Sequence, residues 1–349
     1  MTTSPATDAG FTPDCDYIIV GAGSAGCTLA NRLSADGAKV ALLEAGPKDW
    51  HPMIHVPAGV LSLLYNESVN WMYATDPELG TGNRRIHWPR GRVLGGSSSI
   101  NGMLFVRGNR ADYDNWAQMG CTGWSYEDCL PHFKAIESYA PGDDEHRGKT
   151  GPLRIEDYRT ILPLTHRFVE AAQQAGFPLT KDLSGAQQEG VGYSQMSRNG
   201  RFRGSTARTF LAEAKYRDNL KVETNALASR LLFDGKRCVG VAFNQKGEDR
   251  ILRAAREVIV SGGTINSPHL LQISGIGPAE HLKSIGVEVV HDLPGVGANL
   301  RDHYATRISY RVKDLVSINE YARPPRLLAE IAKWMTTGNG ALTFGISSA

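Results

Sequence analysis

A glycine-rich turn near the N-terminus constrains the fold of this chain more than any other feature. The turn Gly21–Gly26 follows the apolar run Asp16–Val20 and precedes Cys27–Ser34, in which apolar residues recur at helical spacing. A second apolar run, Lys39–Leu43, ends at Glu44. Strand, glycine turn, helix and strand in this order predict a βαβ unit, so we expect an α/β fold with a doubly wound parallel sheet.

Each glycine of this G-x-G-x-x-G pattern has a mechanical reason. Gly21 permits the tight turn, Gly23 lets the backbone approach a pyrophosphate, and Gly26 lets helix and strand pack closely. The following helix offers free N–H groups to phosphates, and Glu44 can accept hydrogen bonds from ribose hydroxyls. The unit predicts dinucleotide binding without distinguishing NAD from FAD. The cofactor contacts predicted in it are Gly21, Gly23, Ser24, Ala25, Gly26, Glu44 and Ala45.

Composition excludes several other classes of protein. The chain has 349 residues, 41% of them hydrophobic and 21% charged, which suffices for a substantial core. A formal net charge of +2 gives no reason to expect a nucleic-acid partner. The five cysteines are scattered and form no CxxC pair, and residues 1–16 lack the features of a secretory signal. No apolar run is long enough to span a membrane. These observations predict a cytoplasmic protein without a membrane span.

The rest of the chain mixes loops, helices and strands. We expect a loop-rich stretch from Pro47 to about Arg90 and a plausible segment boundary at Pro141–Gly151. Hydrophobic periodicity predicts helices over Tyr126–Tyr139 and Thr165–Ala175, and strands over Asn219–Phe233, Cys238–Asn244 and Ile251–Val260.

Three further stretches carry a family resemblance. Gly91–Met103 (GRVLGGSSSINGM), continued by LFVRGN and Asp112–Trp116, resembles the first signature of the glucose–methanol–choline (GMC) flavoprotein oxidoreductases. Gly263–Gly277 resembles a second family signature, and Gly295–His303 resembles another stretch of the family. The resemblance runs from about Asp14 to the end of the chain. It implies FAD as the cofactor, and a Rossmann-like FAD-binding domain of the glutathione-reductase type interleaved with an incomplete α+β substrate domain.

The resemblance also implies how the chain is divided. Residues 14–150 and 219–304 correspond to two parts of the FAD-binding domain. Residues 151–218 correspond to the first part of the substrate domain, and 305–349 to a truncated second part. Because the family's C-terminal third has no counterpart here, the chain resembles an N-terminal portion. We expect such a portion to be less stable than the parent protein, with an exposed sheet edge.

The stretch Gly91–Met103 is rich in glycine and serine, which suits a large flat flavin. Its glycines let the backbone approach the ring closely, and its serine hydroxyls can form hydrogen bonds to the phosphates. A single serine there is equally consistent with a turn cap, and Trp71 is equally consistent with an ordinary half-buried aromatic residue. Ile100 stands where some family members carry a histidine that binds FAD covalently, so we expect non-covalent FAD. The contacts implied by the resemblance are Trp71, Arg92, Val93, Gly96, Ser97, Asn101, Gly102, Met103, Leu104 and Ala228.

The resemblance implies oxidation of an alcohol by hydride transfer to the flavin, with a primary or choline-like alcohol as substrate. Oxygen or a quinone-type or dye-type acceptor would take the electrons. The family's base is a histidine of the C-terminal part, and no histidine of this chain matches it, so no catalytic residue is assigned. Pro52 separates His51 from His55, which argues against a helical metal site. The alternatives are a non-catalytic FAD-binding fragment, and the family's hydroxynitrile-lyase and light-driven decarboxylase branches.

Overall fold

The computed structural model describes residues 12–303, 305–306, 308–345 and 347–349. Contacts between Cα atoms divide them into two compact units. Unit 1 comprises residues up to 50, 66–99 and 206–306, and unit 2 comprises 51–65, 100–205 and 308–349. The division falls at 99/100 instead of the 150/151 expected from the resemblance, so residues 100–150 belong with unit 2. Their assignment to an FAD-binding or a substrate domain stays a prediction.

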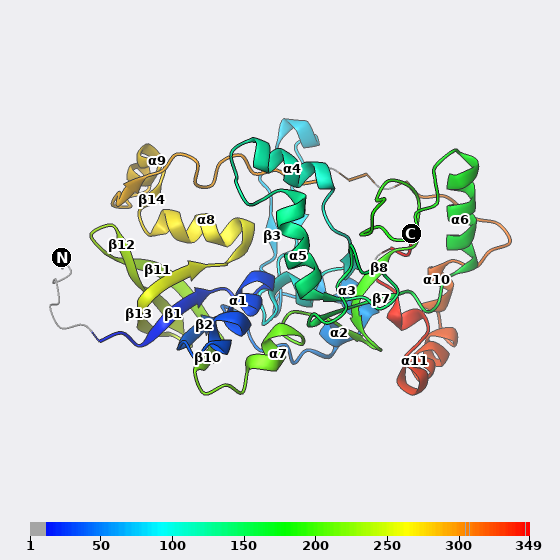
Figure 1. The fold of residues 1–349 in the computed structure, drawn as a ribbon, viewed down its shortest axis with the longest axis horizontal. Helices are drawn as coiled ribbons and strands as arrows, with labels where there is room; N and C mark the ends of the chain where they lie inside the picture. The colour runs from blue at the N-terminus through cyan, green and yellow to red at the C-terminus, as the bar shows by residue number, and fades with distance from the viewer. Residues whose placement is uncertain (1–11, 304, 307, 346) are drawn as a thin grey trace. The chain divides into compact units, whose positions relative to one another are not determined.

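Unit 1 is built on a six-stranded mixed sheet in the order β10-β2-β1-β13-β12-β11. The strands β1 (Cys15–Val20), β2 (Val40–Leu43), β10 (Leu220–Glu223) and the second half of β13 (Glu248–Val260) are parallel (Figure 1). Strand β12 (Arg237–Gln245) pairs antiparallel with the first half of β13 on one side and with β11 (Ala226–Asp234) on the other. The predicted doubly wound α/β arrangement is therefore present. The apolar stretch after Asn219 is split into β10 and β11 by a turn at Asn225, whose φ is +53°.

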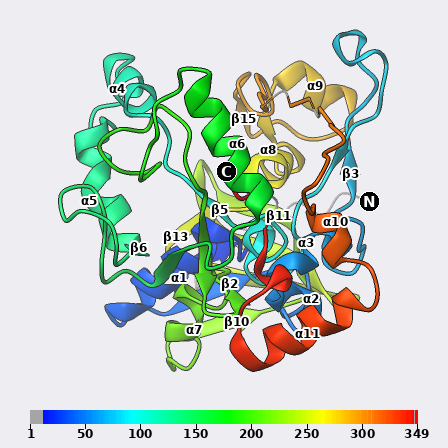
Figure 2. The same cartoon turned by 90° about the vertical axis from the view of Figure 1, so that its right-hand side faces the viewer.

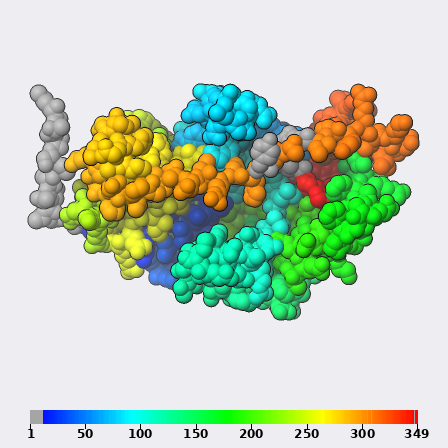
Figure 3. Space-filling model, turned by 90° about the horizontal axis from the view of Figure 1, so that it is seen from above, coloured from blue at the N-terminus to red at the C-terminus, as the bar shows by residue number. Residues whose placement is uncertain are grey.

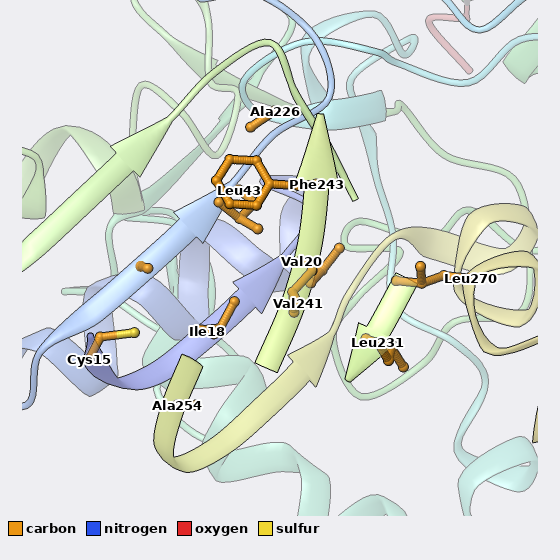
Figure 4. Close-up of a cluster of buried hydrophobic side chains, with 11 residues drawn as sticks. Cys15, Ile18, Val20, Leu43, Ala226, Leu231, Val241, Phe243, Ala254 and Leu270 are labelled. Carbon is orange, nitrogen blue, oxygen red and sulfur yellow. The ribbon is translucent and has the colours of Figure 1, made fainter. Parts of the chain in front are cut away.

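Alternate residues of β1 and β2 point to opposite sides of this sheet, and both sides are covered by other elements there. On one face, Ile19, Val40 and Leu42 pack against helix α1 (Ser24–Ala35) and helix α7 (Phe210–Ala214). On the other face, Ile18, Val20 and Leu43 pack against Phe243 and Val241 of β12 and Leu270 of helix α8 (Gly263–Ile273), as Figure 4 shows. Helix α1 begins three residues before the predicted start at Cys27, since the glycine turn already forms its first turn.

Short elements complete unit 1. In the predicted loop-rich stretch, the short strands β3 (Tyr73–Ala74) and β4 (His87–Trp88), each two residues long, pair antiparallel. A 3-10 helix lies between them at Leu79–Thr81, and another follows at Gly96–Ser99. After α8 come β14 (Ile276–Gly277), helix α9 (Ala279–Ser284) and β15 (His291–Asp292), with β14 and β15 parallel. The segment 293–303 lies on the surface, in orange in Figure 3. It is tied down where the Trp88 indole Nε1 donates to Asp302 Oδ2 at 2.7 Å.

Unit 2 contains a small sheet in the order β5-β8-β7-β6, with β9 paired to β8. Its strands are β5 (Leu104–Phe105), β6 (Glu137–Ser138), β7 (Leu153–Asp157), β8 (Gln195–Asn199) and β9 (Phe202–Arg203). Its helices, several of which face the viewer in Figure 2, are α2 (Pro52–His55), α3 (Val60–Leu63), α4 (Arg110–Gln118), α5 (Tyr126–Ile136), α6 (Pro163–Gln174), α10 (Ile318–Tyr321) and α11 (Arg326–Thr337), with 3-10 helices at Pro57–Gly59 and Ala341–Thr343.

Two predicted helices of unit 2 are present with shifted ends. Helix α5 begins at a capping box of Ser125 and Asp128, and it ends at Ile136 instead of Tyr139 because Glu137 enters strand β6. Helix α6 begins at Pro163, two residues before the predicted start. Proline is favoured in the first position of a helix, because its fixed φ fits the helix and no N–H is needed there. None of the helices formed by the described residues is long and apolar enough to cross a lipid bilayer.

Candidate functional site

A cavity of about 830 Å³ opens in unit 1 at the carboxyl ends of three parallel strands. Val20 and Gly21 at the end of β1, Leu43 and Glu44 at the end of β2, and Val260 at the end of β13 contribute to its wall. In a doubly wound sheet, ligands bind outside the carboxyl ends of the strands where the strand order reverses. Strand β1 lies between β2 and β13 at such a point.

Two helices begin at this cavity. The first turn of α1 contributes Ser24 and Ala25 to the lining, and the first turn of α8 contributes Thr264 and Ile265. Each helix N-terminus carries backbone N–H groups without intrahelical partners and the positive end of the helix dipole. The cavity therefore favours an anionic group such as a pyrophosphate.

The glycines of the turn have the packing roles predicted for them. Gly21 has a φ of +99°, and a Cβ there would stand 2.7 Å from the Ser261 carbonyl oxygen. A Cβ on Gly26 would stand 1.9 Å from the carbonyl oxygen of Gly21, so no larger residue fits between helix and strand. A Cβ on Gly23 would meet no atom within 4 Å. The bare backbone of Gly23 faces open space in the cavity.

Glu44 lines the cavity while its carboxylate is already held by the local backbone. Its Oε2 accepts a hydrogen bond from Ala22 N at 3.0 Å, and its Oε1 accepts one from Gly46 N at 2.9 Å. Burial raises the pKa of Glu44 to about 7, against the opposing effect of the two backbone hydrogen bonds and of Arg92. Each carboxylate oxygen has a second lone pair, so the group can still accept from a ligand hydroxyl.

An aromatic stack forms another part of the wall. The rings of Trp71 and Tyr73 are parallel, with centroids 5.7 Å apart, and the guanidinium of Arg92 lies 5.2 Å from the Trp71 ring. The Tyr73 hydroxyl donates to Asn266 Oδ1 of helix α8 at 2.7 Å, which ties the stack to the helix. Burial raises the pKa of the Tyr73 phenol, so it remains a donor at neutral pH.

The structure brings most of the predicted contacts of unit 1 together. Ten of them line the cavity: Gly21, Gly23, Ser24, Ala25, Glu44, Ala45, Trp71, Gly96, Ser97 and Ala228. Three others do not line it: Gly26 packs against Gly21, Arg92 lies over the ring of Trp71, and Val93 is buried. The remaining four, Asn101, Gly102, Met103 and Leu104, belong to unit 2.

Several lining residues were not predicted from the sequence. Tyr73 and the turn Ser261–Asn266 at the start of α8 are the main ones, together with His269 further along the same helix. The turn had a detectable signal, because the apolar strand Glu257–Val260 runs into two glycines and then a helix. This is the same order of elements as at Asp16–Gly26.

Neither a metal centre nor a disulfide forms among the described residues. Among the described residues, no group of three or more His, Cys, Asp or Glu side chains is arranged to hold a metal ion. All five cysteines have free thiols. In Cys27, which is buried beside the glycine turn, burial raises the thiol pKa to about 12, so this group is not a nucleophile.

Comparison with known proteins gives the family. The family model described as GMC oxidoreductase matches residues 15–305. The chain belongs to the GMC oxidoreductase family. It is 45% identical over 337 residues to the mitochondrial choline dehydrogenase of Homo sapiens, an alignment that covers 93% of this chain and 56% of the relative. It is 48% identical to the oxygen-dependent choline dehydrogenase of Pseudomonas putida (strain GB-1), with 93% and 59% covered.

Solved structures of the family share the fold. Pyridoxine 4-oxidase from Mesorbium loti is 34% identical, with a TM-score of 0.77 over 80% of this GMC chain and 56% of that structure. A formate oxidase is 27% identical, with a TM-score of 0.86 over 95% of this chain and 60% of that structure. The predicted Rossmann-like fold class is thus confirmed. The chain spans a little over half the length of the curated relatives and structures that it matches.

Proposed function

We propose that the cavity of unit 1 binds FAD and that the protein oxidises an alcohol of the choline class. The observation that carries the proposal is the open space in front of Gly23, between the N-termini of α1 and α8 and at the carboxyl ends of β1, β2 and β13. The names of the relatives support the substrate class, since several are choline dehydrogenases.

The residues present fit an FAD molecule. Gly23, Ser24 and the first turn of α8 would hold the pyrophosphate, because they offer backbone N–H groups next to a cradle that any side chain on Gly23 would fill. Glu44 would bind ribose hydroxyls, as the acid at the end of the second strand does in dinucleotide sites. Trp71 and Ala228 would flank the adenine end.

When bound, FAD would supply the electron-accepting chemistry of an alcohol oxidation. The cavity-lining residues of unit 1 would bind and orient the group and shield it from water. No histidine of the chain is assigned as the base. His269 lines the cavity, but nothing places it beside a substrate hydroxyl.

We further propose that FAD is bound without a covalent link. Ile100, which stands where some family members carry a linking histidine, is 2% exposed and apolar. Acid precipitation of the FAD-loaded protein tests this point. Release of all flavin into the supernatant is expected, and flavin that stays with the precipitated chain would contradict it.

FAD binding by the full chain tests the cofactor assignment. We expect quenching of free FAD fluorescence on titration with protein, and a Gly23→Leu variant that binds at least roughly 10-fold more weakly because its side chain fills the cradle. Gly80→Leu is the matched control, since a Cβ on Gly80 also meets no atom within 4 Å but Gly80 does not line the cavity. Equal binding by wild type and both variants would place FAD elsewhere.

The substrate class needs a separate measurement. Choline added to the FAD-loaded chain without oxygen should bleach the visible flavin band if the chain carries out the reductive half of the reaction. Readmitting oxygen, or adding a quinone or dye instead, then identifies the acceptor. Loss of colour with another alcohol but not with choline would overturn the choline class while leaving the FAD assignment intact.

A further inference from the structure

A second cavity, of about 620 Å³, lies in unit 1 at the edge strand β10 of the six-stranded sheet. Helix α7 and the segment 48–50 after strand β2 form its walls, and β10 contributes to its floor. Helix α7 and strand β10 are neighbours in Figure 1 and in Figure 2. We call this cavity the edge groove. It shares no lining residue with the cavity proposed for FAD, so its ligand is a separate question.

The floor of the edge groove is apolar and already packed. Leu94, Leu211 and Leu220 belong to the buried hydrophobic cluster that covers one face of the sheet, and all three line the groove. Leu94 N donates to the Pro47 carbonyl oxygen at 3.0 Å, which ties the start of the wall segment to the floor. The groove is therefore formed before a ligand arrives, and binding requires little ordering of the chain.

Two aromatic residues in the wall of the edge groove are largely exposed. Trp50 is 77% exposed and Tyr216 is 84% exposed, and both line the same cavity. Exposed apolar surface with a charged rim is typical of binding grooves, because a ligand can cover the apolar area. Aromatic rings pair best with another flat ring, in an offset stack or edge to face. The two side chains thus favour a ligand that contains a flat aromatic ring.

Each of the two rings has an ammonium group beside it. Lys48 Nζ lies 5.1 Å from the centre of the Trp50 ring, and Lys215 Nζ lies 4.8 Å from the centre of the Tyr216 ring. In the part of the chain that the structure describes, neither ammonium group forms an ion pair with a carboxylate. Both positive charges are therefore available to a ligand that contacts the rings.

The charge of the edge groove is mostly positive. Arg208 adds a third cation to the two lysines, and Asp49 contributes a carboxylate to the lining. A cleft in which one sign of charge predominates concentrates ligands of the opposite sign. A guanidinium group can also bond both oxygens of a carboxylate at once. The lining therefore selects an anion, whereas the rings and the floor select an apolar body.

We propose that the edge groove binds a small flat aromatic anion. The ring of this ligand lies against Trp50 and Tyr216, above the leucine floor. Its anionic group pairs with the cations of the groove, foremost Lys48 and Lys215. The inference adds a binding site to the protein and does not depend on FAD binding or on alcohol oxidation in the first cavity.

Naphthoate is the probe for the test, because it combines a flat ring system with a carboxylate. Calorimetric titration of the full chain is expected to give a dissociation constant of about 1 mM or below, which is reasonable for a ligand of this size. Two analogues with the substituent at the same carbon each lack one feature. Naphthamide lacks the charge, and decalin carboxylate lacks the aromatic ring. Each should bind at least roughly 5-fold more weakly, and equal affinity of either analogue would overturn the proposal.

Matched variants locate the bound probe. Tyr216→Ala should weaken naphthoate binding at least roughly 5-fold, whereas Tyr310→Ala, which changes a side chain that is likewise 84% exposed, should leave it unchanged. Lys215→Gln should weaken binding and make it less sensitive to salt, whereas Lys236→Gln changes an exposed lysine outside the groove. Because all four side chains are exposed, the variants should melt as wild type does.

Other results would contradict the proposal. If Gly23→Leu abolishes naphthoate binding and Tyr216→Ala does not, the probe occupies the FAD cavity instead. Self-association of the wild-type chain that Trp50→Ala abolishes would assign the edge groove to a second copy of the chain. A titration without heat of binding up to about 5 mM naphthoate would also overturn it. A chain that binds naphthoate in the groove but binds no FAD would contradict the proposed function alone.

Discussion

Gly96 lies against Gly23, so closely that a Cβ on Gly96 would stand 2.7 Å from the Gly23 Cα. The two glycines come from separate stretches of unit 1, one in the β1–α1 turn and the other in the 3-10 helix Gly96–Ser99, and both line the cavity. Gly96 also has a φ of +53°. The Gly21–Gly26 turn is thus braced by a second segment of the chain, in which position 96 has no room for a side chain.

Gly96→Ala is expected to destabilise the chain by roughly 1–3 kcal/mol and to weaken FAD binding, because the added methyl group displaces Gly23. Thermal unfolding and FAD titration measure the two effects. Gly82→Ala is the control, since Gly82 has a similar φ of +65° but no atom within 4 Å of its Cβ position. If both variants lose the same stability, backbone strain alone accounts for the change and the brace has no role.

The second prediction concerns the pH dependence of stability at Glu44. Burial raises the pKa of this carboxyl from 4.5 to about 7. Because the folded-state pKa lies above the unfolded one, Glu44 favours folding most below about pH 4.5, and this contribution disappears as the pH rises through about 7. The full difference corresponds to roughly 3 kcal/mol in the free energy of unfolding.

Glu44→Gln removes the titrating group and should remove this part of the pH dependence. We expect the melting temperature of wild type to fall relative to that of the variant between about pH 5 and about pH 8. Melting curves of the FAD-free proteins across this range provide the measurement. Parallel pH profiles for the two proteins would mean that Glu44 does not titrate there.

The predictable part of the site is the part encoded by neighbouring residues. Gly21, Gly23 and Ser24 follow one another in a turn whose geometry has a fixed purpose, and Glu44 comes directly after the next strand. Short-range patterns of this kind predict both the strand–turn–helix unit and a ligand class for it. They also placed the parallel sheet, since a βαβ unit requires parallel strands.

The rest depends on contacts between distant residues. Tyr73 meets Asn266 across 193 positions of sequence, and no local pattern links them. Helical periodicity continues past Ile136, but pairing of Glu137 and Ser138 with strand β7 ends the helix there. Tertiary pairing overrides local propensity in such cases. The burial of Glu137 with two arginines was likewise not foreseen, because charged residues are mostly exposed.

The third prediction concerns Tyr73. Tyr73→Phe keeps the ring stacked on Trp71 but removes the hydroxyl that donates to Asn266 Oδ1. We expect a loss of about 1 kcal/mol in stability, the usual net value of one hydrogen bond, and a smaller effect on FAD binding than Trp71→Ala causes. Tyr216→Phe changes a side chain that is 84% exposed and should stay within about 0.5 kcal/mol of wild type. Equal losses for Tyr73→Phe and Tyr216→Phe would exclude a role for the Asn266 bond.

The last prediction concerns the ion cluster at the centre of unit 2. Glu137 is 0% exposed, and its Oε1 accepts from Arg107 Nη2 and from Arg147 Nε, both at 2.7 Å. Arg147 Nη1 also donates to Asp182 Oδ1 at 2.6 Å. Removing the charge of Glu137 leaves two buried cations with one anion between them, and breaking such a buried set typically costs about 3–5 kcal/mol.

Glu137→Gln should therefore lower the urea midpoint of the full chain far more than Glu170→Gln, which changes a surface pair with Arg167 whose carboxylate side chain is 51% exposed. The surface change is expected to cost less than about 1 kcal/mol, because water screens the pair. A Glu137→Leu variant separates charge from packing: it should be worse than Glu137→Gln, which can still accept from one arginine. If Glu137→Gln unfolds at the wild-type midpoint, the two arginines are neutralised by Asp182 alone and the cluster does not stabilise unit 2.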